Sequence, residues 1–141
     1  MNVKDIICKY ETAQKDIQIK LDFLKKIVNE EDQLWTAYER MDVGFFLNEG
    51  AINLFADSLQ MVDDTERLKQ YDLQDIRKIY ECLVEYYPDN IQYHRDLIGF
   101  VYNVLDDEVA TLALINKAAE RIDVVQDYFQ TITTEIEKSK L

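Results

Sequence analysis

The stretch from Asp72 to Ile122, DLQDIRKIYECLVEYYPDNIQYHRDLIGFVYNVLDDEVATLALINKAAERI, decides the fold. It contains two amphipathic patterns that meet at a Pro-Asp-Asn corner, and a third that begins at the acidic run 106–108. Within each pattern, apolar residues recur at steps of three and four, which is the spacing of one helix face. Pro88 has no N–H and pushes the preceding residue out of the helical region, so it ends the first helix. The stretch therefore predicts a helix–turn–helix–turn–helix core.

The starts of these helices can be placed from their capping residues. Asp72 is a good N-cap, and Asp75 stands three residues later, as in a capping box. Asn90 can cap the second helix. No helix breaker appears between the acidic run and Lys138, so the third helix is expected to be long.

The third helix carries a seam of apolar residues that alternate steps of three and four. This is the pattern of a helix that supercoils against another. The seam can pack along a similarly long first helix, expected over 3–31, or against a second copy of the protein, and the sequence leaves both open. Its residues are Ile115, Ala118, Ile122, Val125, Phe129, Ile132 and Ile136.

Between the first helix and the core, the signals are shorter. Acids at 30–32 are expected to open a short helix over 34–41, because negative charge is favourable at a helix N-terminus. A second helix is expected over 51–62. Whether the region 41–62 is one helix or two is left open, and 63–70 reads as a loop or an exposed helical extension.

Length and composition indicate a single all-α domain over 1–141. The chain has 141 residues, of which 48% are hydrophobic, and it contains three Gly and one Pro. A chain of this size can bury about 68–70% of its unfolded surface. So little Gly and Pro suits long helices better than strands and tight hairpins.

The net charge and the cysteines limit which partners and which cellular compartment we expect. The net charge of −12 argues against nucleic-acid binding, which needs clustered Lys and Arg. The acids either only keep the protein soluble or form a surface for a basic protein. Cys8 and Cys82 are predicted to be buried thiols in a reduced compartment. With no signal-peptide core and no run of ~18 apolar residues, we expect a cytoplasmic protein and no membrane partner.

No residue set indicates catalysis, a metal or a cofactor. His94 is the only histidine and has no ligand at metal-binding spacing. The three glycines are dispersed, so no phosphate-binding loop is expected. The acidic clusters near helix ends are interpreted as caps rather than as cation ligands. We therefore expect a protein that is not an enzyme, although an enzyme using carboxylates and a metal remains an alternative.

Residues 72–122 resemble the tetratricopeptide repeat, a helical hairpin of 34 residues that stacks into arrays. The resemblance implies antiparallel helical hairpins stacked in a bundle, here with long N- and C-terminal helices. Ile76, Tyr80, Leu83 and Pro88 stand at the repeat's second-helix and corner positions, and Tyr93, His94, Gly99, Tyr102 and Ala118 at positions of the next repeat.

The resemblance also implies a site for a partner peptide on the first helix of a repeat. Carried onto this chain, that face consists of Tyr93, Asp96, Phe100 and Asn103. The alternative is that Tyr93 and Phe100 are buried against the preceding helix. Separately from the resemblance, Tyr86 lies off the core stripe and is a candidate contact residue. Tyr80 and Tyr102 fall on the core faces of their helices.

Two functions follow as expectations. The first is an intracellular protein–protein interaction module, such as an adaptor, chaperone or regulatory protein, whose partner is another protein or peptide. The second is a small acidic inhibitor, such as an immunity protein or a phage-type antagonist, that blocks a basic active site. A homodimer is compatible with both.

Overall fold

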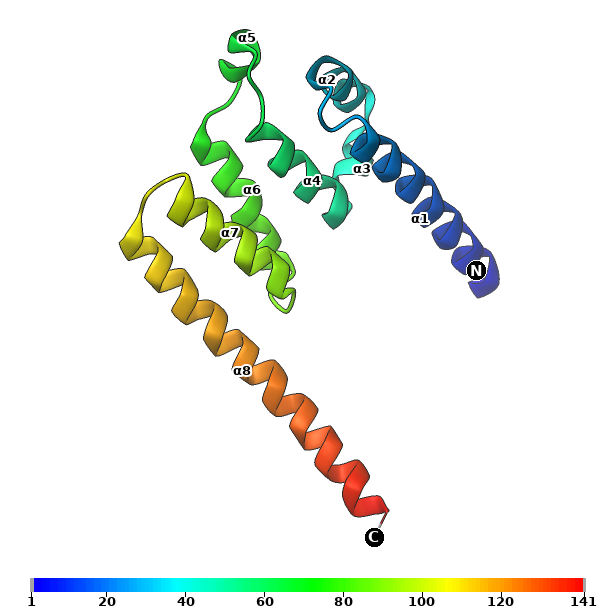
Figure 1. Ribbon diagram of the computed structural model, residues 1–141. Coiled ribbons are helices and arrows are strands. Elements are labelled where there is room, and N and C mark those ends of the chain that lie inside the picture. The colour runs from blue at the N-terminus through cyan, green and yellow to red at the C-terminus, as the bar shows by residue number, and fades with distance from the viewer. Residues whose placement is uncertain (1, 141) are drawn as a thin grey trace. The chain divides into compact units, whose positions relative to one another are not determined.

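The computed structural model describes residues 2–140 and confirms the all-α prediction (Figure 1). Within these residues there are eight α-helices and no β-strand. The helices are α1 Val3–Lys26, α2 Glu31–Arg40, α3 Val43–Phe46, α4 Glu49–Leu59, α5 Thr65–Leu68, α6 Leu73–Tyr86, α7 Ile91–Asn103 and α8 Glu108–Ser139.

Contacts between residues divide the chain into two compact units. Unit 1 ends at Gln70 and contains α1 to α5, and unit 2 begins at Tyr71 and contains α6 to α8. The single domain expected over 1–141 stays a prediction.

In unit 1, the first helix is shorter than predicted. α1 ends at Lys26 rather than at residue 31, and the backbone N–H of Ile27 bonds the carbonyl of Leu24. The acids that follow then open a new helix, as expected, with Glu31 and Asp32 in the first turn of α2. The sequence prediction was too long because the apolar residues Ile27 and Val28 continue the helical spacing into the turn. Periodicity alone could therefore not locate the end of the helix.

The region 41–62 forms separate helices, which answers the question that the sequence left open. Met41 has an extended backbone, and the Asp42 side chain caps α3 by accepting from the N–H of Phe45. The Asn48 side chain then caps α4 by accepting from the N–H of Ala51. Two capping residues six positions apart thus start two separate helices, and the first of these is a single apolar turn.

The core of unit 1 is built by α1 to α4. Its buried residues are Leu21, Leu24, Leu34, Tyr38, Phe45 and Ala51. Tyr38 and Phe55 meet edge to face with ring centroids 5.0 Å apart, a favoured geometry for aromatic pairs. The segment 63–70, left open between loop and helix, contains the short helix α5.

In unit 2, the predicted helix ends are confirmed. Asp72 and Asp75 form a full capping box at the start of α6. Tyr87, the residue before the proline, leaves the helical region, and Asn90 caps α7. Asp107 caps α8, which then runs without interruption to Ser139.

Helix α7 lies between α6 and α8 and packs against both (Figure 1). The rings of Tyr80 in α6 and Phe100 in α7 are 5.5 Å apart, and both side chains are buried. From α8, Thr111 and Ala118 are the buried residues. The buried residues of unit 2 therefore come from all three of its helices, with α7 in the middle.

The outer parts of the two longest helices are exposed. α8 extends well past α6 and α7 (Figure 1), and most apolar residues of its second half, such as Phe129 and Ile136, are exposed. In α1, the buried residues are Leu21 and Leu24, near its C-terminal end. Cys8 is therefore exposed, so its predicted burial was wrong, while Cys82 is half-buried. Within residues 2–140, no helix is both long and apolar enough to cross a membrane.

Candidate functional site

Two of the predicted contact residues are core residues of unit 2. Tyr93 and Phe100 are buried, and their rings contact Tyr87 and Tyr80 respectively. Both contacts are with the end or the body of α6. Their burial corresponds to the alternative in which these side chains pack against the preceding helix.

The other predicted contact residues lie at the surface but are not brought together. Tyr86 is exposed at the end of α6, next to the start of α7. Asn103 is exposed at the far end of α7. Asp96 is half-buried between these ends and accepts a hydrogen bond from Gln92 at 2.7 Å.

The residues that the sequence singled out for chemistry have structural contacts. His94 is buried, and its Nε2 lies 2.6 Å from the carbonyl oxygen of Pro88, at the corner between α6 and α7. From the acidic clusters, Asp64 and Asp107 accept hydrogen bonds from the first backbone N–H groups of α5 and α8. Across the described chain, His, Cys, Asp and Glu side chains do not gather in threes that could hold a metal ion.

An apolar groove runs between α7 and α8 in unit 2, with a volume of about 320 Å³. We call it the α7–α8 groove. Tyr102, expected in the core, is 54% exposed on its wall. The reason is that α8 approaches α7 through the buried Thr111 and Ala118, which leaves Tyr102 to one side. The groove is lined by Ile98, Gly99, Tyr102, Glu108, Thr111, Leu112 and Ile115.

Gly99 gives the groove its depth. A methyl group built at this position would have only the Asn103 side-chain nitrogen nearby, at 4.0 Å. No packing inside unit 2 therefore requires a glycine here. In the middle of a helix, glycine costs about 0.5–1 kcal/mol relative to alanine.

The groove is apolar along its length and acidic at one end. Thr111 offers it no unpaired hydroxyl, because this group donates to the Asp107 carbonyl at 2.7 Å. Glu108 lies on the wall, and the neighbouring Asp106 is exposed. The arrangement suits a bound segment that presents a row of apolar side chains with a basic residue at one end.

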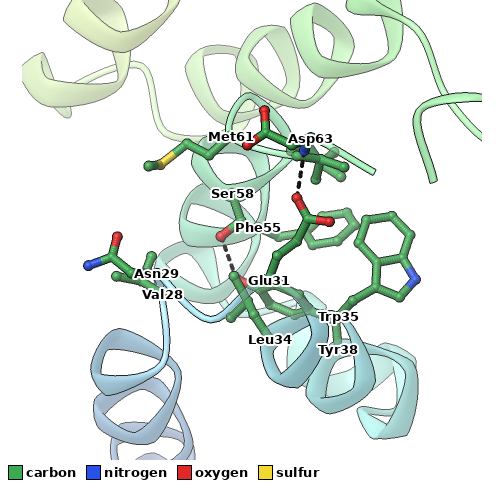
Figure 2. Close-up of a pocket in the computed structure, with 12 residues that line it drawn as sticks. Val28, Asn29, Glu31, Leu34, Trp35, Tyr38, Phe55, Ser58, Met61 and Asp63 are labelled. Atoms are coloured by element: carbon green, nitrogen blue, oxygen red, sulfur yellow. Dashed lines mark hydrogen bonds between the residues drawn. The ribbon is translucent and has the colours of Figure 1, made fainter. Parts of the chain in front are cut away.

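Unit 1 has a smaller pocket, of about 210 Å³, between α2 and α4 (Figure 2). Ligand pockets in proteins measure about 300–1,000 Å³, so this one is small for an organic ligand. Its buried hydroxyl groups are paired, since Tyr38 and Ser58 lie 2.9 Å apart. Burial raises the pKa of the Tyr38 hydroxyl, which therefore remains protonated at neutral pH.

A polar cluster at the edge of this pocket joins α2 to α5. We call it the latch, and it consists of Glu31, Asp32, Asp63 and Arg67. Glu31 accepts a hydrogen bond from the backbone N–H of Asp63 (Figure 2) and an ion pair from Arg67 at 2.7 Å. Both interactions lower the pKa of the Glu31 carboxyl, and the hydrogen bond from Asp63 has the larger effect. Arg67 also pairs with Asp32 at 2.8 Å and lies over the Trp35 ring, 5.5 Å from its centroid.

Sequence reasoning missed both the groove and the latch. The latch joins residues 36 positions apart, and nothing local marks such a pair. The groove had one readable signal, which is a glycine in the middle of an otherwise strong helix pattern. We call the groove the candidate functional site, because it is an exposed concavity of unit 2 whose lining is mostly apolar.

Comparisons with known proteins give no relative for this chain. No family model matches it, and neither a curated protein nor a solved structure is similar enough to count as a match.

Proposed function

We propose that this protein is an intracellular protein–protein interaction module without catalytic activity, and that its α7–α8 groove binds an amphipathic helix of a partner protein. The observation that carries the proposal is an exposed apolar groove whose floor is a glycine that the fold itself does not need. Apolar side chains of the partner would lie along the groove, and a basic residue would meet its acidic end.

The wall of the groove offers enough apolar surface for binding. Leu112 is 63% exposed and Ile115 is 43% exposed, and Tyr102 stands opposite them on α7. Burying a side chain of this size fully contributes about 1.5–3 kcal/mol. Helix-in-groove recognition uses a few such anchors at helical spacing.

Charge supports a basic partner. The net charge of −12 gives the chain an acidic surface that attracts cationic proteins. Glu108 places one such charge on the groove wall. The attraction raises the rate of encounter, while the apolar contacts determine how long the complex lasts.

The resemblance of 72–122 to the tetratricopeptide repeat agrees with peptide binding but puts the partner on a different surface. It implies contacts with Tyr93 and Phe100, which are buried here. The α7–α8 groove presents its apolar residues at the surface instead. The proposal therefore uses the hairpin formed by α7 and α8, not the face of α7 that packs against α6.

The test fills the groove by a substitution at Gly99, the residue at its floor. Gly99→Leu places a side chain in the groove at a position where an added Cβ meets open space, so the fold should be kept while binding is lost. A photo-cross-linking amino acid at Leu112 identifies the partner, and calorimetry then measures its affinity for each variant. Gly99→Ala, which adds only a methyl group, should retain most of the affinity.

The control adds a leucine elsewhere on the same unit. Glu120 is exposed on α8 outside the groove, so Glu120→Leu should bind like the wild type. Equal affinity of the wild type and Gly99→Leu for the identified partner would disprove the groove as the binding site.

The acidic surface favours one second candidate, a small inhibitor that covers a basic active site in the manner of an immunity or phage-type antagonist protein. Such a complex depends mainly on charge, which salt screens within about 8–10 Å at 0.1–0.15 M. A steep loss of affinity with salt, together with no effect of Gly99→Leu, would favour the inhibitor.

A further inference from the structure

The second half of α8 presents an apolar stripe that is half-buried at Ile122 and Val125 and exposed from Phe129 onward. Phe129 is 60% exposed and Ile136 is 51% exposed, although they continue the spacing of residues that pack against α7. An isolated helix shorter than about 12–15 residues is marginal in water, and an apolar stripe gains stability by being covered. A surface that covers this stripe would therefore stabilise the segment.

We propose that residues 121–136 of α8 pair antiparallel with the same residues of a second copy of this chain. The inference is independent of the proposed groove, which lies at the other end of α8. The occupant is identified by two properties of the segment: how its apolar residues face each other, and where its charges fall.

The apolar residues fit an antiparallel pair centred at Asp127. In a heptad, let Ile122, Phe129 and Ile136 be the a positions and Val125 and Ile132 the d positions. Antiparallel helices place each a residue against a d residue of the partner. Ile122 then faces the second copy's Ile132, and Phe129 faces its Val125, so these four apolar residues of each copy form four facing pairs.

The charges beside this stripe match in the same register. Arg121 precedes the first a position, and Glu135 precedes the last one. Antiparallel pairing puts Arg121 of each copy beside Glu135 of the other, and Tyr128 beside its own counterpart at the centre. Arg121 already binds Asp89, but a guanidinium has five N–H donors and can serve both carboxylates.

A parallel pair of the same segment fits less well. It would stack β-branched Val125 and Ile132 on themselves at the d positions, an arrangement that disfavours two-stranded parallel coils. It would also bring two copies of unit 2 side by side, and unit 2 has more acidic than basic residues. The antiparallel pair places these bodies at opposite ends.

The first experiment determines the orientation by cross-linking in the full chain. Cys8 and Cys82 are replaced by serine, and single cysteines are then introduced by Tyr128→Cys or Ile136→Cys. With a short bismaleimide reagent, the antiparallel pair cross-links at position 128 and not at 136. Cross-linking at 136 and not at 128 would show a parallel pair and overturn the proposal.

The second experiment measures association by sedimentation equilibrium. Glu135→Lys places like charges together twice in the dimer and should weaken association by about tenfold, since each exposed pair contributes up to about 1 kcal/mol. Glu137→Lys makes the same change of charge off the stripe and should not weaken it. Lys140→Glu should have no effect, whereas a parallel pair would place Lys140 beside Glu135.

Two results would overturn the proposal outright. One is a monomer at every concentration for the unmodified chain, with α8 still helical by hydrogen exchange. The other is equal weakening by Glu135→Lys and Glu137→Lys, because the register predicts a difference between these two positions.

Discussion

The two units hold their helices together in different ways. In unit 2, α7 packs against α6 on one side and α8 on the other, and aromatic and aliphatic side chains of these helices are buried. In unit 1, the helices after α1 are short, and the last of them, α5, has no buried residue. It is tied to α2 by Glu31 and Arg67 instead. One unit depends on apolar burial, and the other adds a polar latch at its end.

This difference predicts how each unit responds to change. Removing volume from an apolar core costs several kcal/mol, because a cavity remains. Removing a partly exposed ion pair costs far less, because water replaces the partner. Trp35, the only tryptophan, lies in unit 1, so its fluorescence reports that unit while hydrogen exchange follows both.

The largest effect is expected for Phe100→Ala. Phe100 is buried against Tyr80 in the centre of unit 2, and Phe-to-Ala changes in cores cost about 3–5 kcal/mol. Denaturant unfolding should show unit 2 losing its exchange protection at much lower concentration. Tyr102→Ala, on the exposed neighbouring turn of α7, is the control and should cost far less.

The same variant tests how independent the units are. Unit 1 has its own buried cluster, so the Trp35 transition of Phe100→Ala should stay where it is in the wild type. If the Trp35 transition moves together with that of unit 2, the chain unfolds as one cooperative domain, as the sequence analysis predicts.

A smaller effect, of opposite sign, is expected for Gly99→Ala. The added methyl group meets open space, and alanine is favoured over glycine in a helix interior by about 0.5–1 kcal/mol. Unit 2 should therefore become more stable by that amount in denaturant unfolding. A glycine at a helix position where the fold favours alanine is consistent with a role of Gly99 in binding.

Unit 1 supplies the matched control. A methyl group at Gly50 would lie 3.2 Å from the Asn48 side-chain oxygen, the atom that caps α4. Gly50→Ala should therefore gain little or lose stability. Equal gains at both glycines would mean that helix propensity alone decides, and that Gly99 has no special environment.

The comparison also shows what the sequence could predict. In unit 2, Asp72, Asn90 and Pro88 fix the helix ends through bonds to neighbouring residues, and such local chemistry is readable in a sequence. The apolar spacing then places Ile76, Tyr80 and Leu97 in the core correctly. Fold class and helix ends follow because both depend on residues a few positions apart.

What the sequence could not predict depends on which neighbour covers a helix face. Tyr102 and Cys8 follow the apolar pattern, yet both are exposed, because α8 passes to one side of the first and no helix of unit 1 buries the second. Tyr93 and Phe100 fit a recognition surface by position, and α6 covers them. The groove is a result of such packing, so Gly99 was its one visible sign.

The smallest effect is expected at the latch of unit 1, as a dependence on pH. The hydrogen bond from Asp63 and the ion pair with Arg67 hold the pKa of Glu31 below its usual 4.5. A carboxyl whose pKa is lower in the folded state adds stability above its unfolded pKa and loses it as the pH falls through the folded value. Unit 1 should therefore lose stability as the pH falls below the usual 4.5 of this carboxyl.

Glu31→Gln isolates this contribution, because it keeps the shape of the side chain and removes its charge. The variant should show a flatter loss of unit 1 stability over that pH range, followed by Trp35 fluorescence, since Arg67 lies over the Trp35 ring. Arg121 likewise lowers the pKa of Asp89 from its usual 3.8, so Asp89→Asn should flatten the acid response of unit 2 and leave that of unit 1 unchanged. If Glu31→Gln and the wild type lose Trp35 signal in parallel as the pH falls, the latch does not hold α5 to α2, and unit 1 depends on apolar burial as unit 2 does.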